Sequence, residues 1–387
     1  MKNFTIFKEM AYSFTLPIVI VLPLLVMLVA TGGRTSTTEI LETDYTIQDD
    51  YEAVVENNEE SCNAEPANSN QGQIDAKYED YDDECNINDF QEIHDDQQEA
   101  TLQPTFSHPP LPKTITVLRT QTGAVENICL ETYVSWVVLA EVLPYFQHDA
   151  LAAQAVAART YIIHRVERTA RHHRHPQADV CDNFACCLVA RSPQAHSALW
   201  GEASVMPFYE RVREAVEATQ GYVIKYDNTP IDALFHASSP GGTENIRYVW
   251  GNTRPYLVAV SSPETRPEQH LTFSGREILD RVLGAGSYTL AQDAPTLGRV
   301  SRNSSGRVEY LYIYGHRICP LQLRSRLGFR STNFTVTQSQ GSLSFTITGH
   351  GHGVGMSQHG ANAFALQGWD WQQILHHYYT GVELVKR

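Results

Sequence analysis

One glutamate stands where a proton donor would be expected. Glu141 carries the late charge of the apolar run ETYVSWVVLAEV, residues 131–142, which should form a buried helix that ends before Pro144. Burial and the negative end of the helix both disfavour a charged carboxylate, so we expect a raised pKa for Glu141. Such a group could donate a proton near neutral pH. A solvent-facing glutamate on an amphipathic helix is the alternative.

A second group has the residue types of a metal site. One histidine and three cysteines have the spacing H-x5-C-x4-C-C, and a set of thiolates and imidazole would complete a closed tetrahedral zinc site of structural type. They are His175, Cys181, Cys186 and Cys187. A disulfide among the three cysteines, or unused thiols, remain alternatives, and His172 and His173 are competing nitrogen ligands.

The third group is the glycine-rich string GHGHGVGMSQHGA, residues 349–361. No acid or cysteine follows to complete a metal site, and the lysine of a phosphate loop is absent nearby. The glycines would let a ligand approach the backbone, and neutral hydrogen-bonding side chains would suit the hydroxyl groups of a sugar. The side chains in question are His350, His352, Ser357, Gln358 and Asn362. The alternative is a tightly packed turn.

Predicted elements place these groups on a folded part that begins at Lys113. A hairpin should precede the helix of Glu141, and a second helix capped by Asp149 should carry Arg159, which could pair with Glu141 or hold substrate. Further helices are expected near residues 208–219, 276–285 and 369–379, the last closing the chain. Strands are expected on both sides of the turn at residues 227–228, at 307–314 and at 342–348. The pattern predicts an α+β domain with two lobes and antiparallel sheets.

The N-terminal part has a different character. Residues 10–33 carry no charge and are long enough for one membrane crossing, and the preceding Lys2 and Lys8 predict a cytoplasmic segment 1–9. A cleaved signal peptide is the alternative. Residues 34–112 are rich in acidic and poor in branched apolar side chains, and are expected to be a disordered linker. A catalytic domain over residues 113–387, outside the cell membrane, would follow.

Charge and cysteine content restrict the function. Residues 35–110 hold 21 of the 44 acidic residues and one basic residue, so the net charge of −15 belongs to the linker and the rest of the chain carries about +5. The folded part could therefore accept an anionic polymer, and we expect no nucleic-acid partner. Seven cysteines are an odd number for a disulfide framework, and the three within residues 181–187 favour local chemistry.

Several longer strings resemble one family. In chain order they include LAEVLPYFQHDALAAQAVAARTY, GYVIKYDNTPIDALFHASSPGGTE, VWGNTRPYL, LRSRLGFRSTNF, GHGHGVGMSQHGANAFALQG and HHYYTGVEL. These strings are similar to stage II sporulation protein D, a family that includes amidase-enhancer relatives, over residues 113–387. The resemblance implies a lytic transglycosylase that acts on peptidoglycan strands stripped of stem peptides during engulfment in sporulation. It also implies an amidase partner of the stage II sporulation protein P type and a membrane anchor protein.

The resemblance also implies roles for residues. The catalytic acid of the family corresponds to Glu141 and its helix arginine to Arg159. From the chemistry of the residues themselves, we expect Arg159, Gly241, His352 and Gln358 to contact the substrate. The zinc of some members would be held by the four residues named above, with Cys186 in place of a second histidine, and no organic cofactor is expected. Two departures put substrate contacts in doubt: His359 replaces a tyrosine, and Pro240 precedes the Gly-Gly pair.

The expected reaction needs one carboxylate. Glu141 would protonate the glycosidic oxygen between N-acetylmuramic acid and N-acetylglucosamine, then take the proton of the C6 hydroxyl as that oxygen closes a 1,6-anhydro ring. A hydrolase would need a second carboxylate, for which Asp149 and Glu244 remain candidates. The rivals are a non-catalytic glycan-binding activator of an amidase and a catalytic zinc, as in a peptidase.

Overall fold

The computed structural model describes residues 109–167, 175–183, 186–290 and 295–387. The predicted segment 1–9, the predicted anchor 10–33 and nearly all of the predicted linker 34–112 lie outside the described residues, as do His172 and His173. Within these described ranges, no helix is both long enough and apolar enough to span a bilayer.

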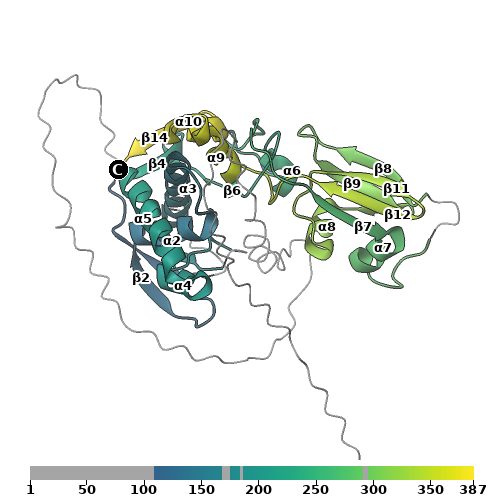
Figure 1. Ribbon diagram of the computed structural model, residues 1–387, viewed down its shortest axis with the longest axis horizontal. Coiled ribbons are helices and arrows are strands. Elements are labelled where there is room, and N and C mark those ends of the chain that lie inside the picture. Colours follow the sequence, from purple (N-terminus) through teal and green to yellow (C-terminus); the bar gives the residue numbers. More distant parts are fainter. Residues whose placement is uncertain (1–108, 168–174, 184–185, 291–294) are drawn as a thin grey trace, which may run out of the picture. The chain divides into compact units, whose positions relative to one another are not determined.

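The larger of two hydrophobic cores is built around one alanine-rich helix. Every residue from Ala150 to Ile163 of α3 is buried, because small side chains let neighbouring elements approach it on all sides (Figure 1). The helices of this lobe are α2 (Leu130–Glu141), α3 (His148–Glu167), α4 (Pro193–Trp200), α5 (Glu202–Ala218), α9 (Gln358–Leu366) and α10 (Trp371–Tyr378).

Short sheets border this helical core. The antiparallel hairpin of β1 (Thr114–Leu118) and β2 (Val125–Cys129) is extended by β3 (Val180–Cys181), which runs parallel to β1. A second sheet has the order β14-β4-β5, and its β4–β5 turn has positive φ at Asp227 and Asn228, as a two-residue hairpin requires. Its strands are β4 (Tyr222–Tyr226), β5 (Thr229–Pro230) and β14 (Glu383–Lys386).

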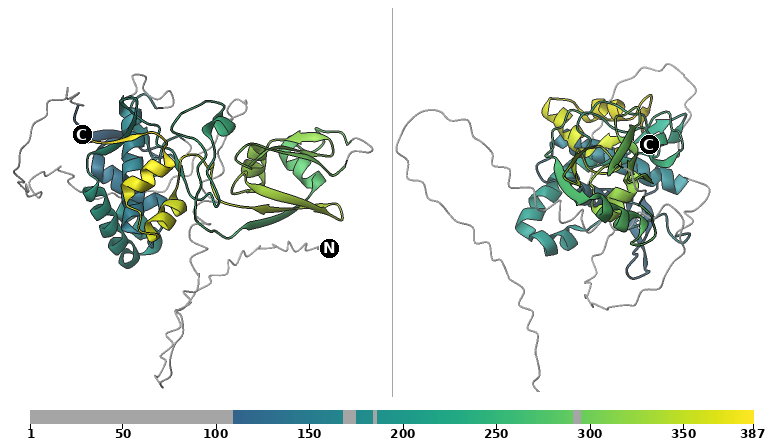
Figure 2. Two further views of the ribbon diagram at one scale, coloured as in Figure 1. Left: turned by 90° about the horizontal axis from the view of Figure 1, so that it is seen from above. Right: turned by 90° about the vertical axis from the view of Figure 1, so that its right-hand side faces the viewer.

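The second lobe is an insertion with its own core. Two three-stranded antiparallel sheets, β10-β9-β8 and β11-β12-β7, lie together with two short helices (Figures 1 and 2). Their core contains the packed rings of Phe329, Phe334 and Phe345. The elements are β7 (Gln269–Ser274), α7 (Gly275–Leu283), β8 (Leu297–Arg302), β9 (Val308–Ile313), β10 (His316–Ile318), α8 (Pro320–Leu327), β11 (Phe334–Ser339) and β12 (Ser342–Ile347).

Two parallel strands close the first lobe on either side of this insertion. β6 (Phe235–His236) precedes it, together with the short helix α6 (Ile246–Trp250), and β13 (Met356–Ser357) follows it. Gly355 makes the pairing possible, because a Cβ at this position would lie 2.0 Å from the carbonyl oxygen of Leu234 and its φ is +75°.

The structure confirms the α+β class, the two cores expected of two lobes, the first hairpin and the helices that carry Glu141 and Arg159. Two details were wrong. Asp149 lies inside α3, where its carboxylate accepts from the backbone N–H of Trp371, so it does not cap the helix. The chain also continues past α10 into β14, which pairs with β4.

Arg159 joins three elements of the larger core. Its fully buried guanidinium donates to the Glu131 carboxylate of α2 at 2.6–3.1 Å, and to the carbonyl oxygens of Val216 at 3.3 Å and Tyr222 at 3.2 Å. A buried guanidinium must keep such partners, since desolvation of an unpaired charge is costly.

Replacing Glu131 with alanine should therefore lower the free energy of unfolding by about 2–3 kcal/mol, because Arg159 would stay buried without its anion. Urea denaturation at pH 7 measures the change. Glu210→Ala is the matched control, since the exposed Glu210–Arg213 pair should contribute under about 0.5 kcal/mol. Equal effects of the two substitutions would contradict the structural role given to Arg159.

Candidate active site

Glu141 is the last residue of α2 and is half-buried. The helix ends there because Val142 turns to extended backbone and Pro144 follows. Its Oε2 accepts a hydrogen bond of 3.2 Å from the side-chain amide of Gln358. The structure therefore brings together two of the predicted site residues, which are 217 positions apart in sequence.

Gln358 is held by the start of α9. It is the first residue of that helix and is 4% exposed, and the preceding Ser357 caps the helix by accepting from the N–H of Gly360. The buried Glu264 carboxylate in turn accepts from the Ser357 hydroxyl at 2.5 Å and from the N–H of Ser239 at 2.6 Å. Glu264, which the sequence analysis did not identify, thus positions the amide that contacts Glu141.

The loop after Glu141 packs on the same helix. Asn362 of α9 accepts from the N–H of Gln147 at 2.7 Å, and the ring of His359 lies edge-on to Phe146 with 5.2 Å between centroids. Arg211 of α5 donates to the carbonyl oxygens of Pro144 and Phe146. Both sides of the Glu141–Gln358 contact are therefore fixed.

The glycines of residues 349–355 face the protein. A Cβ on Gly353 would lie 2.6 Å from the guanidinium of Arg307, and one on Gly349 would lie 2.7 Å from the carbonyl oxygen of Ser238. The tightly packed turn, which the sequence left as an alternative, therefore accounts for these glycines. Gly241 differs from them, since it is exposed and a Cβ added to it would meet no atom within 4 Å.

His352 has a neutral ring within this segment. Its Nδ1 accepts from the N–H of Val354 at 3.0 Å, and burial, with the charges of Arg324 and Arg307, lowers its pKa to about 3. Its ring lies 5.1 Å from that of Trp250 and 5.6 Å from that of His236. The structure thus places His352 among aromatic rings, with no charge at neutral pH.

A buried polar network joins the two lobes. Arg307 of the inserted lobe donates to the Ser239 hydroxyl at 2.7 Å, and that oxygen lies 2.6 Å from Nε2 of His236. Glu244 lies 3.8 Å from Arg307 and accepts from Asn303. Arg307 and Glu244 are both under 3% exposed, so the network serves the junction between lobes.

The structure changes the interpretation of one predicted cationic residue and of two alternative carboxylates. Arg159 is paired with Glu131 near the first turn of α2, at the opposite end from Glu141, so the structure does not show the pairing with Glu141 that the sequence allowed. Its full burial also leaves no surface for substrate. The two alternative carboxylates, Glu244 and Asp149, are engaged by Asn303 and by the Trp371 backbone respectively.

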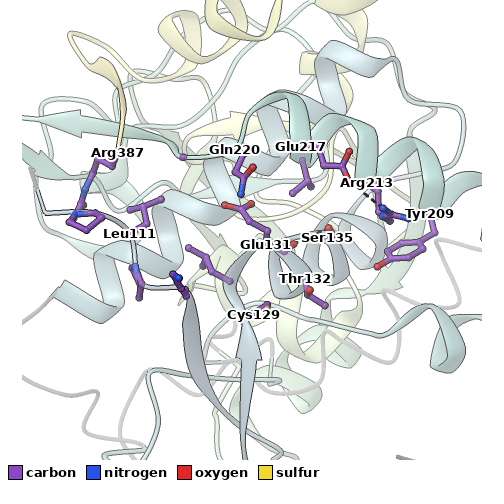
Figure 3. A pocket seen from close by; sticks show the side chains of 16 residues that line it. Leu111, Cys129, Glu131, Thr132, Ser135, Tyr209, Arg213, Glu217, Gln220 and Arg387 are labelled. Carbon is purple, nitrogen blue, oxygen red and sulfur yellow. Dashed lines mark hydrogen bonds and ion pairs between the residues drawn. The ribbon is translucent and has the colours of Figure 1, made fainter. Parts of the chain in front are cut away.

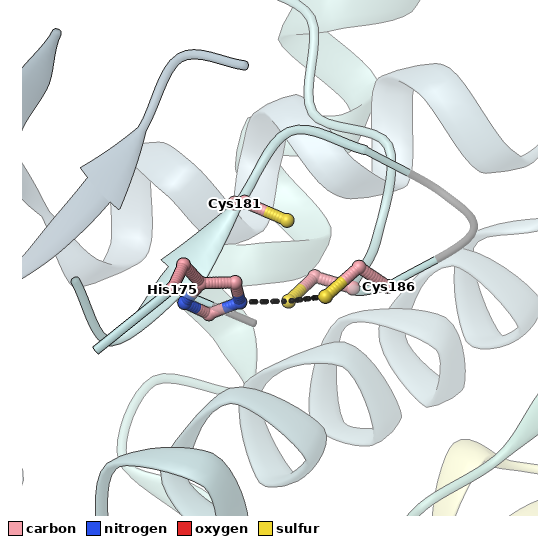
Figure 4. A group of neighbouring side chains, drawn as sticks. His175, Cys181 and Cys186 are labelled. Atoms are coloured by element: carbon pink, nitrogen blue, oxygen red, sulfur yellow. Dashed lines mark hydrogen bonds between the residues drawn. The ribbon is translucent and has the colours of Figure 1, made fainter. Parts of the chain in front are cut away.

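The four predicted metal ligands converge. One ligand atom from each of His175, Cys181, Cys186 and Cys187 lies within 4.8 Å of all the others (Figure 4). Nε2 of His175 is 3.3 Å from the Cys187 sulfur, which is 4.0 Å from that of Cys186. Bonds of about 2.3 Å to sulfur and about 2.0 Å to nitrogen give tetrahedral edges of about 3.5–3.8 Å, so the spacing fits zinc.

The orientation of the imidazole fits as well. Nδ1 of His175 lies 3.2 Å from the carbonyl oxygen of Ala178, so this nitrogen carries the proton and Nε2 is left to bind an ion. In the protein without an ion, the hydrogen bond with Cys186 raises the pKa of the Cys181 thiol to about 11, and burial adds to this. A cation would favour the thiolates.

A separate pocket of about 490 Å³ opens at the other end of α2 (Figure 3). Its lining includes Leu111, Glu131, Arg213 and Gln220, while Glu141 is not part of it. This pocket therefore does not coincide with the candidate acid, which is the last residue of the same helix.

Known proteins resemble this chain along most of its length. The family model described as "Stage II sporulation protein" matches residues 118–226. Stage II sporulation protein D of Bacillus amyloliquefaciens is 35% identical over 296 residues, which are 75% of this chain and 83% of that protein. The chain belongs to the stage II sporulation protein D family. The protein of that name from Bacillus subtilis (strain 168) is 33% identical over 278 residues, 70% of this chain and 79% of that protein.

A more distant relative is the amidase enhancer of Bacillus subtilis (strain 168). It is 27% identical over 292 residues, which are 61% of this chain and 38% of the enhancer. The family resemblance inferred from the sequence strings is thus confirmed.

Acid should destabilise this region through His359. This side chain is 7% exposed, and burial, together with Arg266 and His350, lowers its pKa to about 3. Below the unfolded pKa of about 6.5, the unfolded chain binds a proton that the folded chain excludes until about pH 3. The free energy of unfolding should therefore decrease as the pH is lowered from about 6.5 to about 3, and this group should contribute up to about 1.4 kcal/mol per pH unit.

His359→Gln should reduce the slope of unfolding free energy against pH by up to about 1.4 kcal/mol per pH unit between pH 6 and pH 4.5, which corresponds to one bound proton. Urea denaturation at several pH values measures this slope. The exposed His270 supplies the control, since His270→Gln should leave the slope unchanged. An identical slope in wild type and His359→Gln would show that His359 is not held neutral.

Proposed function

We propose that this family member is a lytic transglycosylase that cleaves peptidoglycan strands lacking stem peptides, during engulfment in sporulation. The observation that supports it best is the Glu141–Gln358 contact, which sets one carboxylate at a helix end with a neutral amide beside it. Family membership and the names of the relatives support a role in sporulation and the cell wall.

The first step would break the glycosidic bond. Protonated Glu141 donates its proton to the oxygen that joins C1 of N-acetylmuramic acid to N-acetylglucosamine, and the C1–O bond breaks with both electrons leaving on that oxygen. Gln358 would hold the carboxyl group through Oε2 and so limit its rotation beside the sugar. As the proton leaves, the amide N–H also stabilises the negative charge that appears on Glu141.

The second step would close a ring without water. The Glu141 carboxylate takes the proton of the muramic C6 hydroxyl, and that oxygen forms the new bond to C1 of its own ring. The internal hydroxyl is already held beside C1, so no second carboxylate is needed to activate water. Of the other two candidate carboxylates, Glu244 is buried in the network between the lobes and Asp149 accepts from the backbone of Trp371, which agrees with a single working acid.

The metal cluster would hold one structural zinc ion. Four protein ligands leave no open coordination position, which disfavours a catalytic zinc as in a peptidase. The ion would join β3 to the chain around Cys186 and Cys187, against the core that contains α2. Its contribution to the reaction would be to stabilise the lobe that carries Glu141.

The setting of the reaction follows from the part outside the described residues. A retained anchor over residues 10–33 and an acidic linker would place the domain outside the membrane, within reach of the wall. An amidase would supply the stripped strands, and the net positive charge of the chain outside the linker suits their carboxylates. A membrane anchor protein would be a further partner.

A second candidate function rests on the amidase enhancer relative: a non-catalytic glycan-binding activator of an amidase. The same fold and the same residues around Glu141 would serve it, with Glu141 binding sugar without giving up a proton.

Product mass separates the two functions. Purified full-length chain incubated with stripped glycan strands should yield 1,6-anhydro ends, which are lighter than hydrolysed ends by one water. Glu141→Gln should lower the rate at least about a thousandfold, because the proton donor and base are lost together. Gln358→Ala should reduce it less, by about tenfold, since only one hydrogen bond to the acid is removed.

Glu210→Gln is the matched control, because Glu210 is exposed on α5 and its substitution should retain activity. Intact strands with both the native chain and Glu141→Gln would exclude the enzyme and favour the activator.

Metal analysis tests the zinc site. The purified chain should contain about one zinc per molecule, and Cys186→Ala should lose most of it, while Cys186→His should keep it because imidazole replaces one ligand by another. Cys319→Ala is the control, since this half-buried free cysteine lies outside the cluster. Reversible loss of activity on chelation with unchanged circular dichroism would instead favour a catalytic ion.

A further inference from the structure

Two exposed aromatic side chains lie against histidines of the glycine-rich segment. Trp250 is 47% exposed and its ring contacts that of His352, and Tyr145 is 42% exposed with its ring 6.4 Å from that of His359. Single exposed apolar residues are ordinary on protein surfaces. Here both have one side supported by the segment that also carries Gln358.

Trp250 sits on a rigid support. It is the last residue of α6, which ends at Gly251 in a left-handed conformation, with the Gly251 N–H donating to Arg247. Asn245 precedes the helix and caps it through its side chain. The backbone N–H of Asn245 also donates to the carboxylate of the buried Glu244 at 2.7 Å. The indole therefore presents its free surface from a fixed backbone.

The partner ring behind the indole is also fixed and uncharged. His352 accepts from the Val354 N–H, and burial keeps its pKa at about 3, so the contact with Trp250 is between two neutral rings at 5.1 Å. On its other side, His352 lies 5.6 Å from His236, which belongs to the buried network at the lobe junction. A cation–π contact is therefore not what orients the indole.

Tyr145 marks the end of this surface close to the acid. It lies four residues after Glu141, in the loop whose carbonyl oxygens at Pro144 and Phe146 accept from Arg211. His352 lies six residues before Gln358, which contacts Glu141. The Cα atoms of His352 and Gln358 can therefore be about 20 Å apart at most. The exposed rings thus lie within the reach of a short oligosaccharide that passes Glu141.

Sugar rings suit such surfaces. A pyranose ring has faces of C–H groups, which pack on aromatic rings, and hydroxyl groups at its edges, which need neutral hydrogen-bonding partners. Trp250 offers both, since the indole has an exposed aromatic face and an N–H donor.

We propose that Trp250 is a stacking platform for one sugar ring of the glycan strand, remote from the bond that Glu141 cleaves. The inference deepens the proposed function, on which its assignment to a glycan rests. The platform would govern affinity for the strand and its dependence on strand length, while the chemical step would depend on Glu141. Stacking recognises the ring face, so it should act on strands with and without the lactyl group of muramic acid.

The structure provides a matched control for the test. Trp200 of α4 is also exposed, at 38%, and its ring also packs on a histidine, His196, at 4.5 Å. It lies on the helical core, away from the glycine-rich segment. A general effect of removing an exposed indole would appear at both positions.

The experiment measures binding without cleavage. Full-length chain carrying Glu141→Gln is titrated with stripped peptidoglycan strands and, separately, with chitohexaose, which lacks lactyl groups. Adding Trp250→Ala should weaken the affinity for both by about tenfold, whereas adding Trp200→Ala should change it less than about twofold. Trp250→Phe should recover most of the affinity, because it restores an aromatic face.

Fluorescence gives a second readout on the same samples. The saccharide-induced change in tryptophan emission should disappear in Trp250→Phe and persist in Trp200→Phe. Equal binding by the Trp250→Ala and Trp200→Ala chains would overturn the proposal, as would a loss confined to stripped strands, which would indicate recognition of the lactyl group. If Trp250-dependent binding is found but the native chain makes no anhydro ends, the platform stands and the transglycosylase function fails.

Discussion

The hydrogen bond from Gln358 to Glu141 is the contact on which the arrangement of this protein depends. A carboxyl at the end of a helix can rotate, and the proposed reaction requires a defined position from which it could give and take a proton. The structure fixes the amide with Glu264 and Ser357 and fixes the loop beyond Glu141 with Asn362. Three buried polar side chains, those of Glu264, Ser357 and Asn362, thus support the surroundings of Glu141.

The sequence predicted those features that short stretches determine. The helices of Glu141 and Arg159 follow from apolar content and from Pro144, and the metal ligands could be grouped because they lie within thirteen consecutive residues. The partner of Arg159 could not be predicted, since helix packing decides which of two glutamates on α2 it meets. Glu264 was missed because nothing near it in sequence shows that it would meet Ser357.

The glycine-rich string shows why residue type alone misleads. Alternating glycines suggest an open bed for a ligand, yet here they allow backbone and the Arg307 guanidinium to approach within a distance that any side chain would block. In the proposed function, the glycines of the segment would not touch the ligand themselves. It supports the rings of Trp250 and Tyr145 and presents Gln358, while its own glycines allow the two lobes to join.

The parallel pairing of β6 with β13 across the inserted lobe has a consequence for biosynthesis. Chains emerge from the ribosome N-terminus first, so Glu141 emerges long before Gln358, the residue that completes its surroundings. Contacts of such long sequence separation also form late, because the intervening chain must first be ordered. A partly synthesised molecule would therefore lack the Glu141–Gln358 contact, which could form only once nearly the whole domain had been made.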